Sequence, residues 1–359
     1  MRIINIVDSI AALNIGIWHA AVSTAEQLSK YSIETELWYP GNNTLSGYPY
    51  IKPVNLLSTE LFYISELIKT RNLATSKDII ITHGCWTFPT KWGFKFKKLG
   101  FNWIYTPHGM LEPWALRQKR VKKQIYFSIF EKRMAGNASV IRAVSSPEMR
   151  SLQQLFPLKK MILIPNGVNP VSNKNRALNN ATTYLFMARL HQKKGIVPLV
   201  KAWLVSELNN RKNCRLVIAG PDQGELNTLE LLINKSTNIE YVGSVYGEKK
   251  ERLLNESTFF LLPSFSEGFP SSVLEAMSYG LICLISPGCN LPEALTEDIS
   301  MEILPEEGSI QSKLNMTLSL SADQIKIKSE ESRFFVDRNF SLQKIALLQK
   351  NLYNSLLDV

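Results

Sequence analysis

Cysteine is scarce in this sequence, and long apolar runs are missing. The four cysteines, at positions 85, 214, 283 and 289, form no Cys-x-x-Cys pair. This spacing argues against a zinc cluster or a dithiol redox motif, and the low count suits a reducing cytosol. No apolar stretch approaches the ~18 residues that a membrane-spanning helix needs. The opening residues, MRIINIVDSI, predict a first strand rather than a signal peptide. We therefore expect a cytoplasmic protein that is soluble or rests on a membrane surface.

Charge is moderate overall but unevenly distributed. The 359 residues are 45% hydrophobic and 20% charged, which is an ordinary globular composition and excludes disorder for most of the chain. Residues 1–170 carry 21 basic and 10 acidic side chains, whereas residues 171–359 carry 20 and 21. A basic coat for nucleic acid would spread over the whole chain. We therefore expect one positive face on the first half.

Short apolar runs alternate with longer amphipathic stretches, which indicates parallel sheets covered on both faces. In the first half a helical pattern covers about Ile17–Lys30, and the predicted strands are Ile3–Val7, Ile33–Trp38, Ile79–Thr82, Trp103–Thr106, Val140–Val144 and Ile162–Ile164. In the second half the predicted strands are Tyr184–Met187, Leu216–Ala219, Glu240–Val242, Thr258–Leu262 and Leu281–Ile285. The predicted helices there are Ile196–Leu204, Ser272–Ser278 and Leu342–Leu357.

A polar stretch separates the two sets of elements. Residues 169–182, NPVSNKNRALNNAT, hold few large apolar side chains and are the best linker candidate. The sequence thus predicts an α/β protein with one domain over 1–168 and another over 183–339. Ligands of open α/β sheets bind at the carboxyl ends of strands, near helix N-termini. Two facing domains would place such loops on both sides of one cleft.

The most informative stretch is PSFSEGFPSSVLEAM, residues 263–277, in which a strand leads through a Gly/Pro/Ser loop into a helix. Backbone N–H groups at that helix start offer an anion site. The carboxylates of Glu267 and Glu275 beside it suit sugar and ribose hydroxyls. Two structural alternatives stay open. Ser272-Val-Leu-Glu275 fits a capping box, and Glu267, as a loop carboxylate, is either solvated or functional.

Two cations follow the first strand of the second half, in FMARLHQKKG, residues 186–195. Arg189 leaves the strand end, and Lys194 precedes the next helix. An arginine that forks onto oxygens and a lysine that acts as a point charge suit a diphosphate. Either cation taken alone is more simply a solvated loop residue. His108 lies after another strand, in the tight turn Pro107-His108-Gly109, and is either a structural histidine or a ligand contact.

Together these stretches resemble a known family. Arg189-Leu190-x3-Lys194-Gly195 followed by Glu267-x7-Glu275 resembles the GT-B glycosyltransferases of family 4. Three further segments are similar to that family in the same order: TPHG at 106–109, IPNGV at 164–168 and NLPE at 290–293. The bacterial members that build surface polysaccharides are the most similar. The resemblance implies two Rossmann-like domains, with the helix at about 340–359 packed back on the first.

The resemblance also implies roles in donor binding. Arg189 and Lys194 would contact the donor diphosphate, Glu275 the ribose hydroxyls and Glu267 hydroxyls of the transferred sugar. Backbone N–H groups of the loop, at Gly268 and Phe269, would line the phosphates and the sugar.

Further implications concern the first domain and the chemistry. His108 would face the transferred sugar, so the implied catalytic set is His108, Glu267, Arg189 and Lys194. The family acts with retention and without a divalent metal, and this sequence has no Asp-x-Asp motif. The two cations and the helix start would then stabilise the departing charge. The loop after the first strand often carries tandem glycines in the family, whereas only Gly16 is present here, which still permits close backbone approach.

Most of the positive excess lies in two clusters. One, KWGFKFKK at 91–98, contains Lys95, Lys97 and Lys98; the other, RQKRVKK at 117–123, contains Lys119, Arg120, Lys122 and Lys123 and runs on towards Lys132-Arg133. Aromatic residues between lysines suit an anionic membrane interface, where each cation contributes ~1 kcal/mol. The pyrophosphate of a lipid-linked acceptor would use the same charges. A solvated helix face is the alternative, and it is favoured for Lys132-Arg133.

The sequence therefore predicts a retaining glycosyltransferase. It would move a sugar from a nucleotide diphosphate, with a UDP-sugar favoured, to a lipid-linked or oligosaccharide acceptor in O-antigen, capsule or exopolysaccharide synthesis. It would act at the inner face of the cytoplasmic membrane. The alternatives are a sugar-nucleotide epimerase or phosphorylase-like enzyme of the same architecture, an inactive family member, and a non-enzymatic basic protein that binds nucleic acid. No nucleic-acid motif is present, and nucleic acid is not an expected partner.

Overall fold

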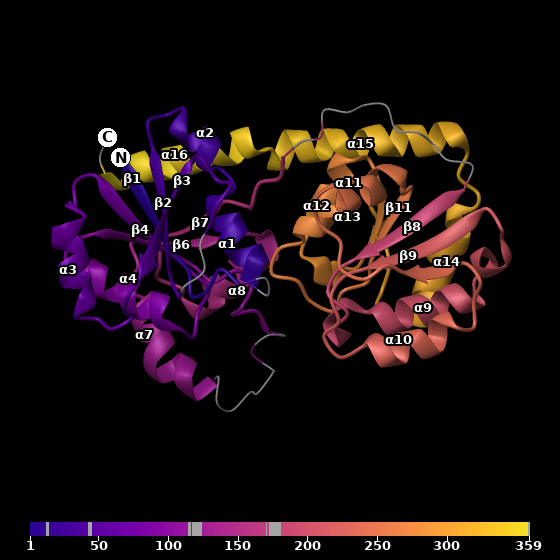
Figure 1. Cartoon of the computed structure of the whole chain (residues 1–359), viewed down its shortest axis with the longest axis horizontal. Helices are drawn as coiled ribbons and strands as arrows, with labels where there is room; N and C mark the ends of the chain where they lie inside the picture. Colours follow the sequence, from indigo (N-terminus) through magenta and orange to yellow (C-terminus); the bar gives the residue numbers. More distant parts are fainter. Residues whose placement is uncertain are drawn as a thin grey trace. The chain divides into compact units, whose positions relative to one another are not determined.

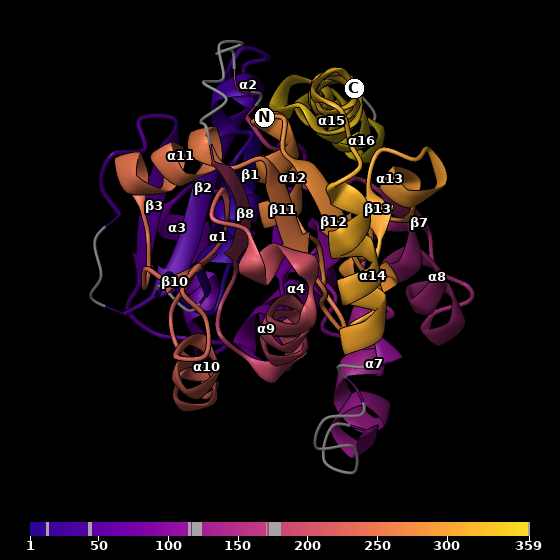
Figure 2. The same cartoon turned by 90° about the vertical axis from the view of Figure 1, so that its right-hand side faces the viewer.

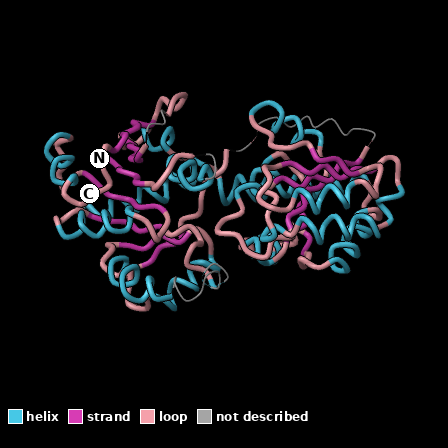
Figure 3. The backbone as a smooth tube through the Cα atoms, turned by 60° about the horizontal axis from the view of Figure 1, so that its bottom comes forward, coloured by secondary structure: helices cyan, strands magenta, loops and turns pink. Residues whose placement is uncertain are grey.

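The chain forms two units, each built on one parallel sheet. The computed structural model describes residues 1–11, 14–41, 45–113, 116, 124–169, 171 and 181–357. One unit comprises Met1–Gly167 and Leu342–Val359, and the other comprises Val168–Ser341. Figure 3 shows the strands of each unit, in magenta, with helices around them. The predicted α/β class with two Rossmann-like units is confirmed. The predicted linker, 169–182, lies mostly outside the described residues.

The first sheet has seven strands in the order β3-β2-β1-β4-β5-β6-β7, all parallel. Their bounds are β1 Arg2–Ile6, β2 Glu34–Pro40, β3 Ile51–Leu56, β4 Asp78–His83, β5 Asn102–Thr106, β6 Val140–Ala143 and β7 Met161–Leu163. The strand order reverses beside β1, since β2 lies on one side of it and β4 on the other. Ligands of such sheets bind at this switch point, outside the carboxyl ends of the strands.

Helices cover both faces of the first sheet, as alternate side chains of its strands require. They are α1 Ile15–Val22, α2 Ala25–Ser29, α3 Tyr63–Thr70, α4 Phe88–Lys98, α7 Lys132–Ala135, α8 Ser146–Leu155 and α16 Leu342–Leu357, with a π-helical turn over Phe127–Glu131 before α7. Ile4 and Ile80 share one core cluster with Trp92 of α4. Ile3 and Ile79 face the opposite cluster, to which α16 contributes Ile345, Ala346, Leu352 and Tyr353. The last helix therefore completes the core of the first unit (Figure 1).

Two features of the first unit differ from the prediction. Strand β3 was not expected, because its sequence IKPVNL carries Pro53 and polar side chains. It is the edge strand of the sheet, and an edge tolerates a proline that donates no ladder hydrogen bond. The helical pattern over Ile17–Lys30 is interrupted at Ser23 and Thr24 and forms two short helices, α1 and α2. The strands that the sequence did predict agree with the structure to within two residues at either end.

The second sheet has six parallel strands in the order β10-β9-β8-β11-β12-β13. Figure 2 labels five of them, β10, β8, β11, β12 and β13, in this order across the sheet. Their bounds are β8 Thr182–Met187, β9 Cys214–Ala219, β10 Ile239–Tyr241, β11 Phe259–Leu262, β12 Ile282–Ile285 and β13 Met301–Glu302. The helices are α9 Ile196–Val205, α10 Leu226–Ile233, α11 Gly247–Glu256, α12 Ser271–Ser278, α13 Pro292–Thr296, α14 Glu307–Thr317 and α15 Ala322–Phe340. The switch point of this sheet lies between β8 and β11.

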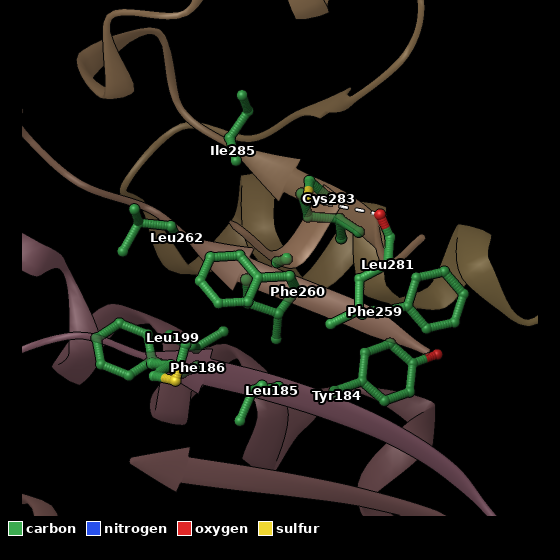
Figure 4. Packing of buried hydrophobic residues seen from close by; sticks show 14 of the residues in the cluster. Tyr184, Leu185, Phe186, Leu199, Phe259, Phe260, Leu262, Leu281, Cys283 and Ile285 are labelled. Atoms are coloured by element: carbon green, nitrogen blue, oxygen red, sulfur yellow. Dashed lines mark hydrogen bonds between the residues drawn. The ribbon is translucent and has the colours of Figure 1, made fainter. Parts of the chain in front are cut away.

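Aromatic packing across β8 and β11 forms the centre of the second core. The rings of Tyr184 and Phe259 stack with centroids 4.6 Å apart, and Trp203 of α9 meets Tyr184 edge-on at 5.2 Å. Figure 4 shows these strands carrying Phe186, Phe260 and Leu262 in the same core. All four cysteines are buried and unbridged. None of the described helices combines the length and apolar character that crossing a bilayer demands.

A glycine in the middle of α4 tests the packing of the first unit. A Cβ at Gly93 would overlap the ring of Trp103, which is fully buried and held by a hydrogen bond from its Nε1 to Thr82 Oγ1 at 2.8 Å. We expect Gly93→Ala to destabilise the protein by about 1–3 kcal/mol, because neither partner can move away. Thermal denaturation should show a clear fall in Tm.

The matched control is Gly308→Ala, also within a helix, where a Cβ meets nothing within 4 Å. This change should leave Tm unchanged or raise it slightly, because alanine favours helices over glycine. Equal Tm values for Gly93→Ala and the native protein would contradict the packing described for α4.

Candidate active site

Three loops at the carboxyl end of the second sheet pack unusually closely on one another. A Cβ at Gly195, which has φ +67°, would overlap the carbonyl oxygen of Pro263 at the end of β11. A Cβ at Gly220, with φ +145°, would overlap that of Ala188 after β8. The Leu190 N–H also donates to Pro221 O at 2.9 Å. Only glycine allows these approaches, so the loops after β8, β9 and β11 form one packed block.

Lys194 and Glu267 form a buried ion pair within this block. Lys194 Nζ lies 2.6 Å from both carboxylate oxygens of Glu267, and the two side chains are 13% and 9% exposed. Glu267 also accepts from the Ser264 hydroxyl, and its backbone N–H donates to Gly288 O at 2.7 Å. We expected Glu267 to be either solvated or functional. The solvated alternative is wrong, because the carboxylate is buried and bonded.

The capping box predicted for Ser272 and Glu275 is absent. Helix α12 begins at Ser271 after Pro270, with no side-chain cap, so Ser272 is already its second residue. The Glu275 carboxylate is instead paired with Lys250 of α11, with Nζ and Oε1 2.6 Å apart and about a third of each side chain exposed. Glu275 therefore does not serve the helix start. Among the described residues its other oxygen has no partner.

The remaining predicted donor contacts lie around the ion pair. Arg189 is exposed, and its guanidinium is bonded to no residue that the structure describes. Phe269 packs its ring against Phe340, with centroids 6.1 Å apart. Within the described chain, the backbone N–H groups of Gly268 and Phe269 donate no hydrogen bond. Among the described residues, the Arg189 side chain in the loop after β8 and two backbone N–H groups in the loop after β11 thus have no partner, and such groups are suited to phosphate oxygens.

His108 lies at the carboxyl end of the first sheet and is paired with a second histidine. It follows β5 with a left-handed backbone, φ +54°. Its Nε2 is 2.9 Å from His83 Nδ1 at the end of β4, and His83 Nε2 is 3.0 Å from Asn5 Oδ1 in β1. Burial and the nearby Arg142 cation lower the pKa of His108 to about 3. The ring is therefore neutral at physiological pH.

A buried carboxylate holds this turn, and a buried guanidinium holds the segment that follows β7. Glu148 accepts from the backbone N–H groups of Gly109 and Val144, and burial raises its pKa to about 7. Arg142 donates to Ile164 O at 2.8 Å and to Pro165 O at 3.0 Å. Sequence reasoning missed Asn5, His83, Arg142 and Glu148. Only Asn5 and His83 could have been found from the sequence, because they lie at or near the carboxyl ends of the strands β1 and β4, beside the switch point where ligands bind.

Gly16 occupies the first turn of α1, after β1. Its φ is not positive, and a Cβ there would meet nothing within 4 Å. The protein itself therefore does not require glycine at this position. The preceding Asn14 is held by a hydrogen bond from its Nδ2 to Asp8 Oδ1 at 3.2 Å.

The first basic cluster differs from the expectation of a membrane-facing aromatic surface. Trp92 and Phe96 are fully buried in the core. Lys97 Nζ donates to Ser139 Oγ at 3.0 Å, and Lys98 lies over the Phe94 ring at 4.5 Å. Lys95 and Lys98 lie one turn apart on one face of α4, whereas Trp92 and Phe96 face the core, so an amphipathic helix explains the mixture of lysines and aromatic residues. Lys95 is half-buried on the same helix.

The second basic cluster, with Lys119, Arg120, Lys122 and Lys123, lies outside the described residues. The chain that follows exposes three large apolar side chains, Ile125, Ile129 and Phe130, each more than half accessible. Lys132 and Arg133 are exposed on α7, as predicted for a solvated helix face.

A solved structure defines the class of fold. Sucrose-phosphate synthase from Thermosynechococcus elongatus has a TM-score of 0.81 to this chain at 19% identity, over 100% of this chain and 99% of that one. At this identity the similarity shows the fold alone, which is the GT-B architecture of glycosyltransferases.

Two family models then identify the chain. The model described as Glycosyltransferase Family 4 matches residues 16–171, and the model described as Glycosyl transferases group 1 matches residues 170–329. Together the two models cover most of the chain, which therefore belongs to the family 4, or group 1, glycosyltransferases.

Two named relatives match rather more than half of this chain. The phosphatidylinositol N-acetylglucosaminyltransferase gpi3 subunit of Schizosaccharomyces pombe is 26% identical over 61% of this chain and 46% of its own length. The UDP-Gal:alpha-D-GlcNAc-diphosphoundecaprenol alpha-1,3-galactosyltransferase of Escherichia coli is 28% identical over 54% of each chain. The matches thus span about half the length of these two relatives.

The buried ion pair makes a testable prediction for stability. Removing one partner leaves the other charged and uncompensated, so Glu267→Ala and Lys194→Met should each destabilise the protein by about 3–5 kcal/mol. Equilibrium urea unfolding measures this change. The double variant should recover part of the loss, because it leaves no unpaired buried charge. Single variants as stable as the native chain would show that the pair is not the contact that joins these loops.

Proposed function

We propose that the chain transfers a sugar, with retention, from a nucleotide diphosphate to a glycan acceptor. The observation that carries this proposal is the set of groups at the β8–β11 switch point. Arg189, the Gly268 and Phe269 N–H groups and the Lys194–Glu267 pair all belong to loops packed at this edge. Such a mixture of donors and carboxylates suits a ligand that has both phosphates and hydroxyls.

The ion pair supports two of the proposed roles at once. An ammonium has three N–H donors, and Lys194 directs two of them at Glu267. The third is left for an oxygen of the donor diphosphate. Glu267 in turn holds Lys194 in one position, so the cation is oriented before the donor binds. In this proposal Arg189 and Lys194 stabilise the charge of the departing nucleotide, and no divalent metal takes part.

Glu275 and His108 complete the proposed contacts. The partly exposed Glu275 carboxylate, bonded at only one oxygen among the described residues, would accept from the ribose hydroxyls. His108, neutral in its buried turn, would accept from a hydroxyl of the transferred sugar. Gly16 would leave room for ligand at the first turn of α1.

For the acceptor we favour a lipid-linked glycan in bacterial surface-polysaccharide synthesis. The printed name of the Escherichia coli relative includes a diphosphoundecaprenol-linked sugar and a UDP-sugar, which supports this class of acceptor and a UDP-sugar donor. The exposed Ile125, Ile129 and Phe130 follow the basic run 117–123 directly. Apolar residues beside cations suit an anionic membrane surface, so we propose peripheral binding at the cytoplasmic face.

Nucleotide release tests the proposed reaction. The purified protein, given UDP-, GDP- or TDP-sugars, should release nucleotide diphosphate only when a polyprenyl-diphosphate glycan is present. EDTA should not change the rate, and NMR should show that the anomeric configuration is kept. An epimer formed without acceptor would favour the epimerase instead, and an inverted product would exclude retention.

Donor affinity should depend on Arg189. A hydrogen bond to a charged group contributes about 1.5–3 kcal/mol, so Arg189→Ala should weaken binding of the nucleotide diphosphate by roughly tenfold to a hundredfold. Isothermal titration calorimetry measures this affinity. The control is Arg211→Ala, which removes an exposed arginine whose partner is Glu207 on the same surface turn. Equal affinities for both variants would remove Arg189 from the donor site.

Vesicle binding tests the membrane surface. Neutralising Lys119, Arg120, Lys122 and Lys123 should weaken sedimentation with anionic vesicles by roughly 1 kcal/mol per cation, whereas donor binding survives. Ile129→Ser with Phe130→Ser should weaken it independently of salt. The matched control neutralises four exposed lysines of the second unit, Lys201, Lys212, Lys235 and Lys326. If this control loses as much binding, the effect is net charge and not a local membrane site.

A further inference from the structure

We propose that Asn5 and His83 act as positioning residues that fix the tautomer of His108. In this tautomer His108 carries its proton on Nε2 and presents an unprotonated Nδ1 to a hydroxyl group of the sugar. The identity of the ligand rests on the function proposed above. The tautomer itself follows from a chain of hydrogen bonds within the first unit.

This series of hydrogen bonds starts at a backbone carbonyl oxygen, which can only accept a hydrogen bond. Asn5 Nδ2 lies 3.2 Å from the backbone carbonyl oxygen of Glu36 in β2, and Asn5 is almost fully buried. A carbonyl oxygen has no proton to give, so the amide nitrogen must face it. Asn5 therefore turns its Oδ1, which also only accepts, towards His83.

His83 transmits this constraint. Its Nε2 is 3.0 Å from Asn5 Oδ1, so Nε2 must carry a proton. A neutral imidazole has a single N–H, and its other nitrogen is an acceptor. Burial above all, together with the nearby Arg142 cation, lowers the pKa of His83 well below its usual value. His83 Nδ1 is therefore an acceptor.

His108 is the last residue in this series of hydrogen bonds. Its Nε2 is 2.9 Å from His83 Nδ1 and must donate. Because the ring is neutral, Nδ1 is left with a lone pair. No described residue donates to this nitrogen. The left-handed turn at His108 and Gly109, held by Glu148, keeps the ring at the end of β5.

The unprotonated Nδ1 of His108 determines which group of the ligand can bind to it. A lone pair on Nδ1 accepts from a hydroxyl, whereas a phosphate oxygen offers no proton and would be repelled. The nearby Arg142 cation disfavours a second proton on the ring. His108 is thus prepared to bind a sugar hydroxyl rather than the diphosphate.

Imidazole nitrogen NMR tests the tautomer in the free protein. The chain has only four histidines, at positions 19, 83, 108 and 191, so a sample labelled with ¹⁵N-histidine gives few resonances. His19→Gln and His191→Gln assign two of them by loss. We expect His83 and His108 each to show a protonated Nε2 and an unprotonated Nδ1. A protonated Nδ1 on His108, or rapid exchange between its two tautomers, would overturn the inference.

A pair of variants tests the role of His83. His83→Gln keeps an amide that can donate to Asn5 and accept from His108, whereas His83→Leu can do neither. We expect His83→Leu to mix the tautomers of His108 and to lower kcat about tenfold or more with little change in donor KM. His83→Gln should recover much of both readouts. If both variants lose activity equally, in proportion to their Tm, His83 is only structural and the inference fails.

A separate NMR measurement tests the contact between His108 and the sugar. Adding the nucleotide sugar that supports turnover should shift the His108 Nδ1 resonance, and adding the nucleotide diphosphate alone should not. A shift with both compounds would contradict selection of a sugar hydroxyl. Failure of the proposed function is distinguishable, because a protein without transferase activity would still show the Nε2–H tautomer in its free state.

Discussion

The ion pair of Lys194 and Glu267 is the contact on which the site in the second unit depends. It joins loops that follow β8 and β11, the two strands at the switch point of the sheet. Its side chains are nearly buried, where opposite charges attract more strongly than in water but cannot be separated without a large desolvation cost. The pair therefore holds both loops in one arrangement before any ligand arrives.

Close backbone packing makes this arrangement possible. Gly195, Gly220 and Gly288 each lie where a Cβ would overlap a neighbouring loop carbonyl. These glycines allow the loops to approach until Lys194 reaches Glu267. At the switch point of the first sheet, hydrogen bonds hold the proposed site residue in place of an ion pair. There a chain of neutral, buried hydrogen bonds from Asn5 through His83 orients His108, and Glu148 and Arg142 support the surrounding turns.

Much of the fold could be predicted from the sequence because strands and helices leave local patterns. Buried strands such as Ile79–Thr82 are continuous apolar runs, and the last helix was placed at its observed bounds, Leu342–Leu357. Edge strand β3 could not be predicted, because its sequence contains Pro53 and polar residues instead of a continuous apolar run. The capping box predicted at Ser272 is absent because α12 begins at Ser271, directly after Pro270, which places Ser272 inside the helix. Ser321 and Gln324 do form such a box at the start of α15.

The site was predictable only in part. The motif residues Arg189, Lys194, Glu267 and Glu275 could be chosen from their types and spacing. Their partners could not, because contacts such as Lys194 with Glu267 or Lys250 with Glu275 join residues that are distant in the chain. For the same reason His83 and Asn5, with no motif of their own, become visible only when β1, β4 and β5 are aligned in the sheet.

A crystal structure of the protein with a nucleotide sugar bound tests the proposed donor site most directly. We expect phosphate oxygens within hydrogen-bond distance of Arg189 and Lys194, ribose hydroxyls at Glu275, and the Lys194–Glu267 pair still intact. A nucleotide bound elsewhere, with the loops after β8 and β11 unoccupied, would contradict it.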